Sequence, residues 1–291
     1  MSLPQVSIVI PAYKPAHFEQ CLRSAIGQTY PNIDISVSDN CPTDEIRAIC
    51  ERFPMVVYQR NVAIREQNVL SATYGAKGHY VKPLFDDDLL HPFCVERMVQ
   101  AAEANPEIGL VFSASTVIDI DNRRLQQRRP FEGTGKLSGR ELHRIVTIGM
   151  VNPVGEFSSI LIRRATLWSI PPARLFWFGD HDCSLGLADA VAYCNLAAAG
   201  GAMYLDEELT YFRRDPRLMS NSNAASNSNI GYCYSDGMDM IIQVHKMGMI
   251  DTAELLATEE AVSKSAERDG NFSQVRDAYV RYTDYVRRVR G

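Results

Sequence analysis

Short apolar runs alternate with segments of helical spacing along the first 115 residues. The runs are rich in Val, Ile and Leu and end at polar or turn residues, so we expect buried strands. The segments between them carry apolar residues three and four positions apart, so we expect helices there. The expected strands are 6–10, 33–37, 55–58, 79–85 and 108–113, and the expected helices are 15–28, 44–53, 66–77 and 92–104. Such alternation is typical of an α/β fold with a doubly wound, mostly parallel sheet.

After residue 115 the pattern loosens. The basic stretch 123–129 is predicted to be an exposed hairpin, and residues 215–230 are so rich in Ser and Asn that we expect a mobile loop. Further strands are expected at 158–162, 203–205 and 209–212, and further helices at 180–199 and over most of 231–290. The chain therefore divides into a first half, 1–115, a second half of the same domain, 116–230, and a C-terminal helical extension, 231–291.

The composition is that of a globular protein, and it limits the partners. Of 291 residues, 46% are hydrophobic and 22% are charged, and the net charge of −5 argues against nucleic acid as the main partner. No apolar run approaches the roughly 18 residues of a membrane span, and no secretory signal is visible. The seven cysteines include no Cys-x-x-Cys pair, so we expect buried thiols rather than a zinc site or disulfides. These features predict a cytoplasmic protein.

Three adjacent carboxylates, residues 86–88, follow the expected strand 79–85. Burying such groups without partners is costly, and the usual counter-charge is a hard divalent cation such as Mg²⁺ or Mn²⁺. The alternative is a solvated acidic turn before the helix that starts near Pro92. Polar residues also follow the first two strands, at 11–14 and 39–40. Because ligands of doubly wound sheets bind beyond the carboxyl ends of the strands, these segments predict one nucleotide-and-metal site.

Five sequence segments form a set that is more specific than any one of them. They are Val6 to Tyr13, Cys21 to Tyr30, Ile35 to Asn40, Asn61 to Ile64 together with Asn68 to Gly78, and Leu84 to Pro92. The first ends a strand in Pro-x-Tyr, the second is a helix with Leu-x-Ser-x-x-x-Gln-Thr, and the last holds the three carboxylates. The set resembles the family 2 inverting glycosyltransferases of the GT-A fold. The resemblance is dense over 1–115 and thinner over 150–220.

The resemblance implies a site for a nucleotide-diphosphate sugar, UDP-linked, together with Mn²⁺ or Mg²⁺. Asp39 resembles the carboxylate that binds the nucleotide base, and Asp86 and Asp87 resemble the pair that reaches the ribose and the metal. The implied donor-binding residues are Pro11, Ala12, Tyr13, Asp39, Asn68, Asp86, Arg213 and Arg214. The implied metal ligands are Asp86, Asp87, Asp88 and Asp215. A metal there would act as a Lewis acid on the departing diphosphate.

An inverting transfer also needs a base for the acceptor hydroxyl. Asp180, in Gly179-Asp180-His181-Asp182, resembles the residue that supplies it, and Asp182 lies two residues later. Glu156 resembles a residue on the acceptor side. The alternative for Asp180 is that it only caps the helix expected to begin there.

Three residues depart from the family pattern. Lys14 stands where Asn is usual, Phe85 stands where many members have another Asp, and Asp215 stands where His is usual. These changes bear on the affinity for metal and on the identity of the donor, whereas they leave the expected fold unchanged.

We therefore expect an inverting, metal-dependent glycosyltransferase of glycan or cell-surface polysaccharide synthesis, with a saccharide or lipid-linked saccharide as acceptor. A nucleotidyltransferase is the alternative enzyme, but it would carry a glycine-rich loop after the first strand, and the loop 11–15 has no glycine. A binding module that keeps the fold without turnover is the other alternative. In the enzyme, the loop 215–230 is expected to close over the donor and exclude water.

The last helix carries Val275, Tyr279, Tyr282 and Val286 on one face, with arginines around them. A basic, Tyr-bearing surface of this kind can dock on an anionic membrane, which would place the protein at the membrane periphery. The alternative is that this face packs on the core, or on a second subunit in a homodimer, and that the arginines are solvated. We favour packing because the apolar face is narrow.

Overall fold

The computed structural model describes residues 3–218 and 227–291, which form two compact units. The first unit comprises Met1–Ser138, Val154–Pro172 and Leu196–Asp215, and the second comprises Gly139–Pro153, Ala173–Asn195 and Pro216–Gly291. Residues 219–226 of the expected mobile loop lie outside the described residues, so the closure of this loop stays a prediction.

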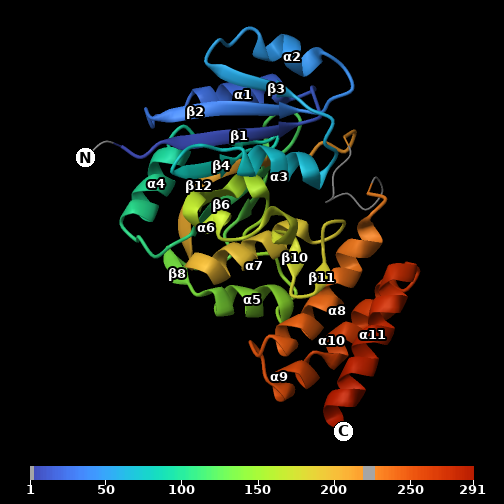
Figure 1. The fold of residues 1–291 in the computed structure, drawn as a ribbon. Helices are drawn as coiled ribbons and strands as arrows, with labels where there is room; N and C mark the ends of the chain where they lie inside the picture. The colour runs from blue at the N-terminus through green and yellow to red at the C-terminus, as the bar shows by residue number, and fades with distance from the viewer. Residues whose placement is uncertain (1–2, 219–226) are drawn as a thin grey trace. The chain divides into compact units, whose positions relative to one another are not determined.

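The first unit is built on one mixed sheet (Figure 1). Across the sheet the strands are β3 (Val56–Arg60), β2 (Ile33–Asp39), β1 (Val6–Ala12), β4 (Tyr80–Pro83), β9 (Ile160–Arg163), β6 (Leu110–Ile118), β12 (Ala202–Arg213) and β5 (Leu89–Leu90). Two further strands branch from it, β7 (Arg124–Arg128) on β6 and β8 (Gly135–Leu137) on β12. The first four strands are parallel, as are β6 and β12, whereas β9 and β5 are antiparallel to their neighbours. The expected α/β class with a doubly wound sheet is confirmed.

The strand β1 lies between β2 and β4 and is buried at every residue. The sequence pattern predicts that this strand stops before Pro11, but the strand continues to Ala12. It can do so because β4 ends opposite Val9, so no ladder hydrogen bond is required of Pro11 on that side. The extension places Tyr13 at the edge of the sheet.

Helices of the first unit pack on this sheet through their apolar faces. In α1, Phe18 and Leu22 are buried, whereas Glu19 and Arg23 pair at 2.8 Å on the outer face. The helices are α1 (Phe18–Ile26), α2 (Glu45–Cys50), α3 (Glu66–Tyr74), α4 (Cys94–Glu103), α6 (Arg164–Trp168) and the short 3-10 helix η1 (Phe157–Ser159). The four helices expected within the first 115 residues are all present, each a few residues shorter than its apolar spacing predicts.

The second half of the sheet differs from the sequence pattern in one strand. β12 is a single long strand where the pattern predicts two short ones, because register shifts between Leu205 and Thr210 bend it without ending its pairing with β6. The basic stretch 123–129 forms the exposed strand β7, which pairs with β6 as a hairpin, as predicted.

The second unit is mainly helical. Its elements are α5 (Gly139–Thr147), α8 (Ile230–Lys246), α9 (Thr252–Ala257), α10 (Glu259–Asp269), α11 (Ser273–Arg290) and a hairpin of β10 (Trp177–Phe178) and β11 (His181–Asp182), which follows the 3-10 turn η2 (Pro172–Arg174). The helix predicted over 180–199 is wrong in its first part, because α7 (Ala188–Gly200) begins eight residues later. Gly179 takes a φ of 58° in the two-residue turn of the hairpin. Asp180 lies in that turn and therefore caps no helix.

The last helix, α11, packs inside its own unit. Val275 and Tyr282 are buried, and the Tyr282 hydroxyl lies 2.6 Å from Thr258 Oγ1. On the neighbouring face, Arg281 donates two hydrogen bonds of 2.8 and 2.6 Å to Asp239 of α8. The apolar face of α11 therefore belongs to the core of this unit, which is the alternative that we favour from the sequence.

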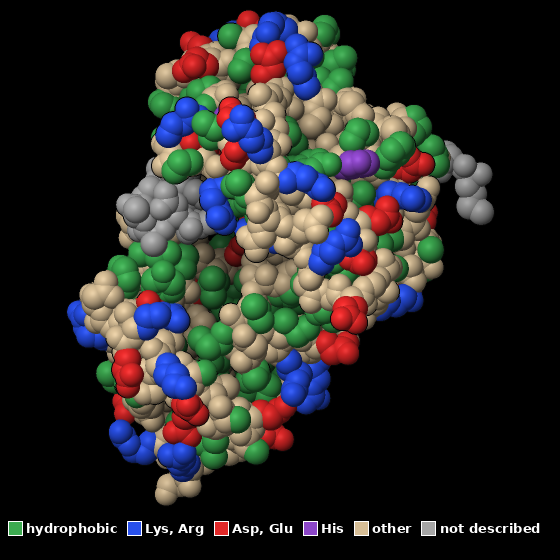
Figure 2. Space-filling view, turned by 180° about the vertical axis from the view of Figure 1, so that it is seen from behind, with side chains coloured by type: hydrophobic (Ala, Val, Ile, Leu, Met, Phe, Trp, Pro, Cys, Tyr) green, Lys and Arg blue, Asp and Glu red, His purple; other side chains and the backbone are tan. Residues whose placement is uncertain are grey.

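The surface carries charges of both signs. On the face shown in Figure 2, Lys and Arg side chains are interspersed with Asp and Glu. None of the described helices is both long and apolar enough to cross a bilayer. All seven cysteines are free, and six of them are buried, as expected.

Candidate active site

Three strand ends of the first unit bring polar side chains to one edge of the sheet. β1, β2 and β4 run parallel, so their carboxyl ends lie at the same edge. Asp39 ends β2, Tyr13 follows β1 and the carboxylates 86–88 follow β4, while Pro11 and Ala12 stay buried within β1. Two of these segments are joined directly. The Asp86 Oδ2 atom accepts hydrogen bonds from the backbone N–H of the first residue after β1 at 2.7 Å and of the second at 2.6 Å.

Asp39 is fully buried at the end of β2 and is held by three protein donors. Its Oδ1 accepts from the backbone N–H of Cys41 at 2.7 Å. Its Oδ2 accepts from the Tyr58 hydroxyl at 2.7 Å and from Arg60 Nη1 at 2.8 Å. Burial raises the pKa of Tyr58, and the hydrogen bond to Asp39 raises it further, so the hydroxyl stays a donor. Both oxygens of the Asp39 carboxylate are therefore engaged by the protein, and its contact with the nucleotide base stays a prediction.

Asn68, in α3, is expected to contact the donor, but its side chain has no hydrogen bond left for one. Its Oδ1 accepts from Ser38 Oγ at 2.8 Å and from Asn61 Nδ2 at 2.9 Å. Its Nδ2 donates to Ser38 O at 3.0 Å and to Asn40 Oδ1 at 2.9 Å. These four bonds exhaust the amide. Asn68 therefore positions the residues that follow β2 and β3, and its contact with the donor stays a prediction.

The carboxylates 86–88 are buried, and a lysine lies on two of them. The Lys14 ammonium contacts the Asp87 carboxylate and lies 3.4 Å from Asp86 Oδ1. Burial disfavours the charged ammonium, but the charges of Asp86 and Asp87 outweigh it and raise the pKa of Lys14. The Lys14 side chain keeps 23% of its surface exposed, so it covers the solvent side of the two carboxylates.

Asp88 is the most deeply buried of the three carboxylates. Its Oδ1 accepts from the backbone N–H of Arg213 at 3.0 Å, and its Oδ2 accepts from Ser158 Oγ. Burial raises the pKa of Asp88 well above its usual range, and the charge of Asp87 raises it further. Both oxygens of this carboxylate are thus engaged inside the protein.

Lys82 is a buried charge that the apolar pattern of 79–85 conceals. It lies in β4, and its ammonium donates to Pro83 O at 3.0 Å and to Ser158 O. Burial lowers the pKa of Lys82, while the charge of Asp88 opposes that shift. A lysine within an otherwise apolar strand is a sequence signal for a buried ammonium with protein partners, because lysine is almost never fully buried without them.

Of the two arginines expected to meet the diphosphate, Arg213 forms its hydrogen bonds within the protein. It is buried, and its Nε donates to Asp87 O at 2.9 Å. Its Nη1 donates to Asp119 O at 2.9 Å and its Nη2 to Gln20 Oε1 at 3.1 Å. Arg214 is exposed. Of the two arginines, Arg214 is therefore the one that faces solvent, and its contact with the diphosphate stays a prediction.

Asp215, expected as a metal ligand, meets a histidine that the sequence reasoning missed. Its Oδ2 lies 3.0 Å from His17 Nε2, and both side chains are buried. His17 immediately precedes α1 and lies close in sequence to the loop 11–15. This proximity was the sequence signal that could have placed His17 at the site. Position 215 thus lacks the usual His of the family pattern, and an imidazole from another segment contacts its carboxylate.

Glu156 presents an unpaired carboxylate oxygen in the first unit. Its Oε1 pairs with Arg128, whose guanidinium also lies 5.1 Å from the ring centre of Phe212. Its Oε2 is buried and has no hydrogen-bond partner among the described residues. The charge of Glu156 contributes to the raised pKa of Asp88, so the two carboxylates lie close enough to interact.

Asp180 and Asp182, the expected base and its neighbour, belong to the second unit. Asp180 is exposed in the hairpin turn, and its backbone N–H donates to Gln243 Oε1 at 3.3 Å. Asp182 Oδ1 accepts from the backbone N–H of Ser184 at 2.9 Å, so this carboxylate holds a turn. Both side chains are exposed, and the role of Asp180 as the base stays a prediction.

Beside this turn lies a cluster with metal-ligand chemistry. His181, Cys183 and Asp236 each place one ligand atom within 4.8 Å of the others. His181 Nε2 lies 2.9 Å from Asp236 Oδ1, and Asp236 Oδ2 accepts from the backbone N–H of Leu187 at 2.9 Å. Burial raises the pKa of the Cys183 thiol far above its usual range, so the thiol stays protonated. The cluster therefore acts as a packed ion pair beside a thiol.

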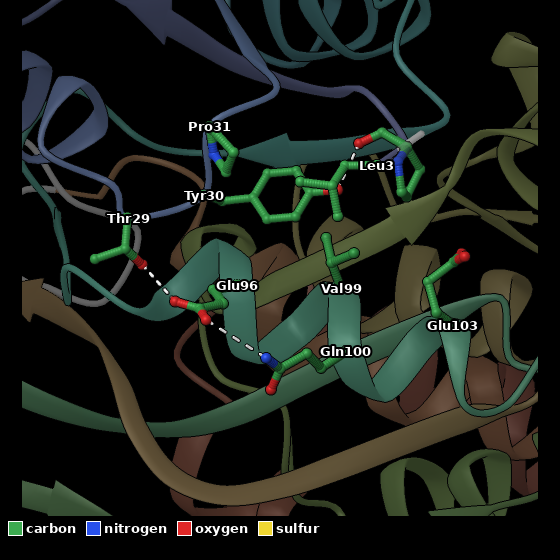
Figure 3. Close-up of a pocket in the computed structure, with 9 residues that line it drawn as sticks. Leu3, Thr29, Tyr30, Pro31, Glu96, Val99, Gln100 and Glu103 are labelled. Atoms are coloured by element: carbon green, nitrogen blue, oxygen red, sulfur yellow. Dashed lines mark hydrogen bonds between the residues drawn. The ribbon is translucent and has the colours of Figure 1, made fainter. Parts of the chain in front are cut away.

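A pocket of about 370 Å³ borders the other end of β1 (Figure 3). Leu3 and Pro4, which precede the strand, line it together with Val99 of α4. On its rim, Thr29 Oγ1 donates to Glu96 Oε2 at 2.7 Å. Ligands of doubly wound sheets bind at the carboxyl ends of the strands, so this pocket is separate from the site around residues 86–88.

Comparisons with known proteins agree on one family. The model of glycosyl transferase family 2 matches residues 7–170. An uncharacterized glycosyltransferase of Haemophilus influenzae is 30% identical over 232 residues, which cover 77% of this chain and 73% of that protein. The uncharacterized protein y4gI of Sinorhizobium fredii is 29% identical over 170 residues, which cover 55% of this chain but only 18% of that protein.

A solved structure extends the likeness to nearly the whole chain. The structure of S. aureus TarS in complex with UDP-GlcNAc superposes with a TM-score of 0.61 over 97% of this chain and 89% of that chain. The sequence identity is 14%, so this likeness shows a shared fold.

Proposed function

The chain belongs to glycosyl transferase family 2, and we propose that it is an inverting glycosyltransferase that uses a UDP-linked sugar. The observation that supports this most is the meeting of Asp39 and residues 86–88 at one edge of the sheet, where the family pattern places the nucleotide. TarS, which shares the fold, is described in complex with UDP-GlcNAc, so UDP-GlcNAc is the first donor to test. The proposed acceptor is a hydroxyl of a saccharide or lipid-linked saccharide in glycan or cell-surface polysaccharide synthesis in the cytoplasm.

In the proposed reaction, the acceptor oxygen attacks the anomeric carbon while the bond from that carbon to the diphosphate breaks. The nucleoside diphosphate leaves with the electron pair, and Asp180 takes the hydroxyl proton. Both carboxylates are exposed, and Asp180 is preferred because Asp182 Oδ1 is engaged by the backbone N–H of Ser184. Glu156 is the alternative base: its Oε2 has no hydrogen-bond partner among the described residues, although its Oε1 pairs with Arg128.

The divalent cation expected from the sequence does not fit residues 86–88 as they lie. Mg²⁺ and Mn²⁺ need carboxylate oxygens that are open to the ion. Here the Lys14 ammonium lies on the first two carboxylates, and both oxygens of the third accept protein hydrogen bonds. Asp215 meets His17 instead. No step of the proposed transfer therefore passes through a metal.

The replacement of Asp180 by Asn tests the base. The two side chains are nearly isosteric, so UDP binding by isothermal titration should be unchanged. The release of UDP from the donor should fall by about 10²- to 10⁴-fold, which is the usual share of a general base. Asp182→Asn is the matched control and should keep most of the activity.

Each alternative has its own outcome in this assay. Wild-type turnover in Asp180→Asn, with loss in Glu156→Gln, would move the base to Glu156. UDP binding without turnover of any UDP-sugar would indicate a binding module. Release of pyrophosphate instead of a nucleoside diphosphate would identify a nucleotidyltransferase.

A further inference from the structure

The Lys14 ammonium lies on the carboxylate oxygens to which the family pattern assigns a divalent cation. We propose that Lys14 is the resident cation of the donor site, so that the nucleoside diphosphate binds without a divalent metal. The inference rests on the proposed function, because it concerns the diphosphate of the same donor.

The position of Lys14 is built into the fold. The backbone N–H groups of Tyr13 and Lys14 both donate to Asp86 Oδ2, at 2.7 and 2.6 Å, so the base of the lysine side chain is fixed against this carboxylate. The ammonium then contacts Asp87 and lies 3.4 Å from Asp86 Oδ1. An ammonium has three N–H donors, and the side chain is 23% exposed, so one donor can face a ligand.

Asp88 and Asp215, two further carboxylates of the expected metal site, are engaged by protein groups. Asp88 accepts from the backbone of Arg213 and from Ser158 Oγ, and Asp215 lies against His17. A metal ion would therefore have to displace the ammonium from Asp87. Losing a charge-assisted hydrogen bond of this kind weakens metal binding by about 10- to 100-fold.

A lysine ammonium can supply the charge stabilisation that the leaving diphosphate needs. Negative charge builds on the diphosphate as the bond to the sugar breaks, and an ammonium stabilises phosphate oxygens as a point charge. Lys14 keeps its proton throughout, because the proton of the acceptor hydroxyl goes to the base. Its role is electrostatic.

Manganese binding without nucleotide tests Lys14 directly. Electron paramagnetic resonance of free Mn²⁺ is followed during titration with the wild type, with Lys14→Asn, which restores the usual family residue, and with Lys77→Asn, an exposed lysine of the same unit as control. We expect Lys14→Asn to bind Mn²⁺ about 10- to 100-fold more tightly than the other two. Lys14→Gln serves the same purpose if Lys14→Asn fails to fold. Equal Mn²⁺ affinity in the wild type and the Lys14 variant would overturn the proposal.

Titration with UDP gives the second readout. The wild type should bind UDP equally in EDTA and in Mn²⁺, whereas Lys14→Asn should bind about 10- to 100-fold more weakly in EDTA and recover in Mn²⁺. Wild-type binding that requires Mn²⁺ would refute the role of Lys14 and leave the glycosyltransferase intact. If UDP binds no variant in either condition, the proposed donor is wrong, and the manganese titration still decides whether Lys14 holds the cation position.

Discussion

Asn68 shapes the donor site through contacts with the protein alone. Its four hydrogen bonds join Ser38, Asn40 and Asn61. The first two are the sequence neighbours of Asp39, and Asn61 follows the adjacent strand β3. The amide is buried, so the loss of any of these bonds would leave a buried polar group without a partner. Asn68 is therefore a positioning residue for the carboxylate that the family pattern assigns to the nucleotide base.

Asn68→Ala should lower the free energy of unfolding by about 1–3 kcal/mol, because it leaves buried polar partners without hydrogen bonds. Gln67→Ala, an exposed neighbour on the same helix, should stay within about 0.5 kcal/mol of the wild type. Urea denaturation measures both. Equal stability of the two variants would show that water or other groups replace the amide bonds.

The family motifs locate residues but do not say which of their bonds the protein itself uses. The pattern places Asp39 and residues 86–88 at one sheet edge, and the structure has them there. Asn68 and Arg213 match the same pattern, yet their hydrogen bonds are spent inside the protein. Those partners come from distant segments of the chain, so no local spacing could indicate them.

At the scale of elements, the β10–β11 hairpin carries Asp180 and is tied to α8. His181 Nε2 lies 2.9 Å from Asp236 Oδ1 and 3.8 Å from Asp239 Oδ2. Burial disfavours the charged imidazole, but the hydrogen bond to Asp236 and the charge of Asp239 outweigh it and raise the pKa of His181. The ion pair is therefore stronger when the histidine is protonated.

This raised pKa makes the anchor dependent on pH. A group whose pKa is higher in the folded state stabilises the fold below its unfolded pKa, and that stability is lost as pH rises through the folded pKa. The gap in melting temperature between the wild type and His181→Gln should thus be largest in mild acid and shrink above neutral pH. A gap that stays constant or widens with rising pH would show that the imidazole binds its partners in the neutral form.

Elements with strong apolar patterns are well predicted, and short ones are not. The strands and helices of the first 115 residues follow from runs of Val and Ile and from helical spacing, because their burial is set by near neighbours in the sheet. The hairpin was missed because Cys183 and Leu187 precede Val191 at intervals of four residues and so continue the helical spacing of α7 backwards. The signal against a helix was Gly179-Asp180 between two aromatic residues and a histidine, which suits a two-residue turn.

At the scale of the whole molecule, the two proposed tasks belong to different units. The matched family segment, 7–170, contains Asp39 and residues 86–88 and ends before Asp180. Substitutions of Asp39 and of residues 86–88 should therefore change nucleotide binding, whereas Asp180→Asn should change turnover alone. The sequence could predict both sets of residues through the family pattern, but it could not predict that a lysine covers the carboxylates.

The stereochemistry of sugar release tests the central claim most directly. Proton NMR can follow the slow hydrolysis of UDP-GlcNAc, or of whichever UDP-sugar the release assay identifies, before the free sugar equilibrates. Attack from the face opposite the diphosphate predicts that the α-linked donor yields the β-anomer first, and that Asp180→Asn abolishes this signal. First release of the α-anomer, or no cleavage of any UDP-sugar, would contradict an inverting glycosyltransferase.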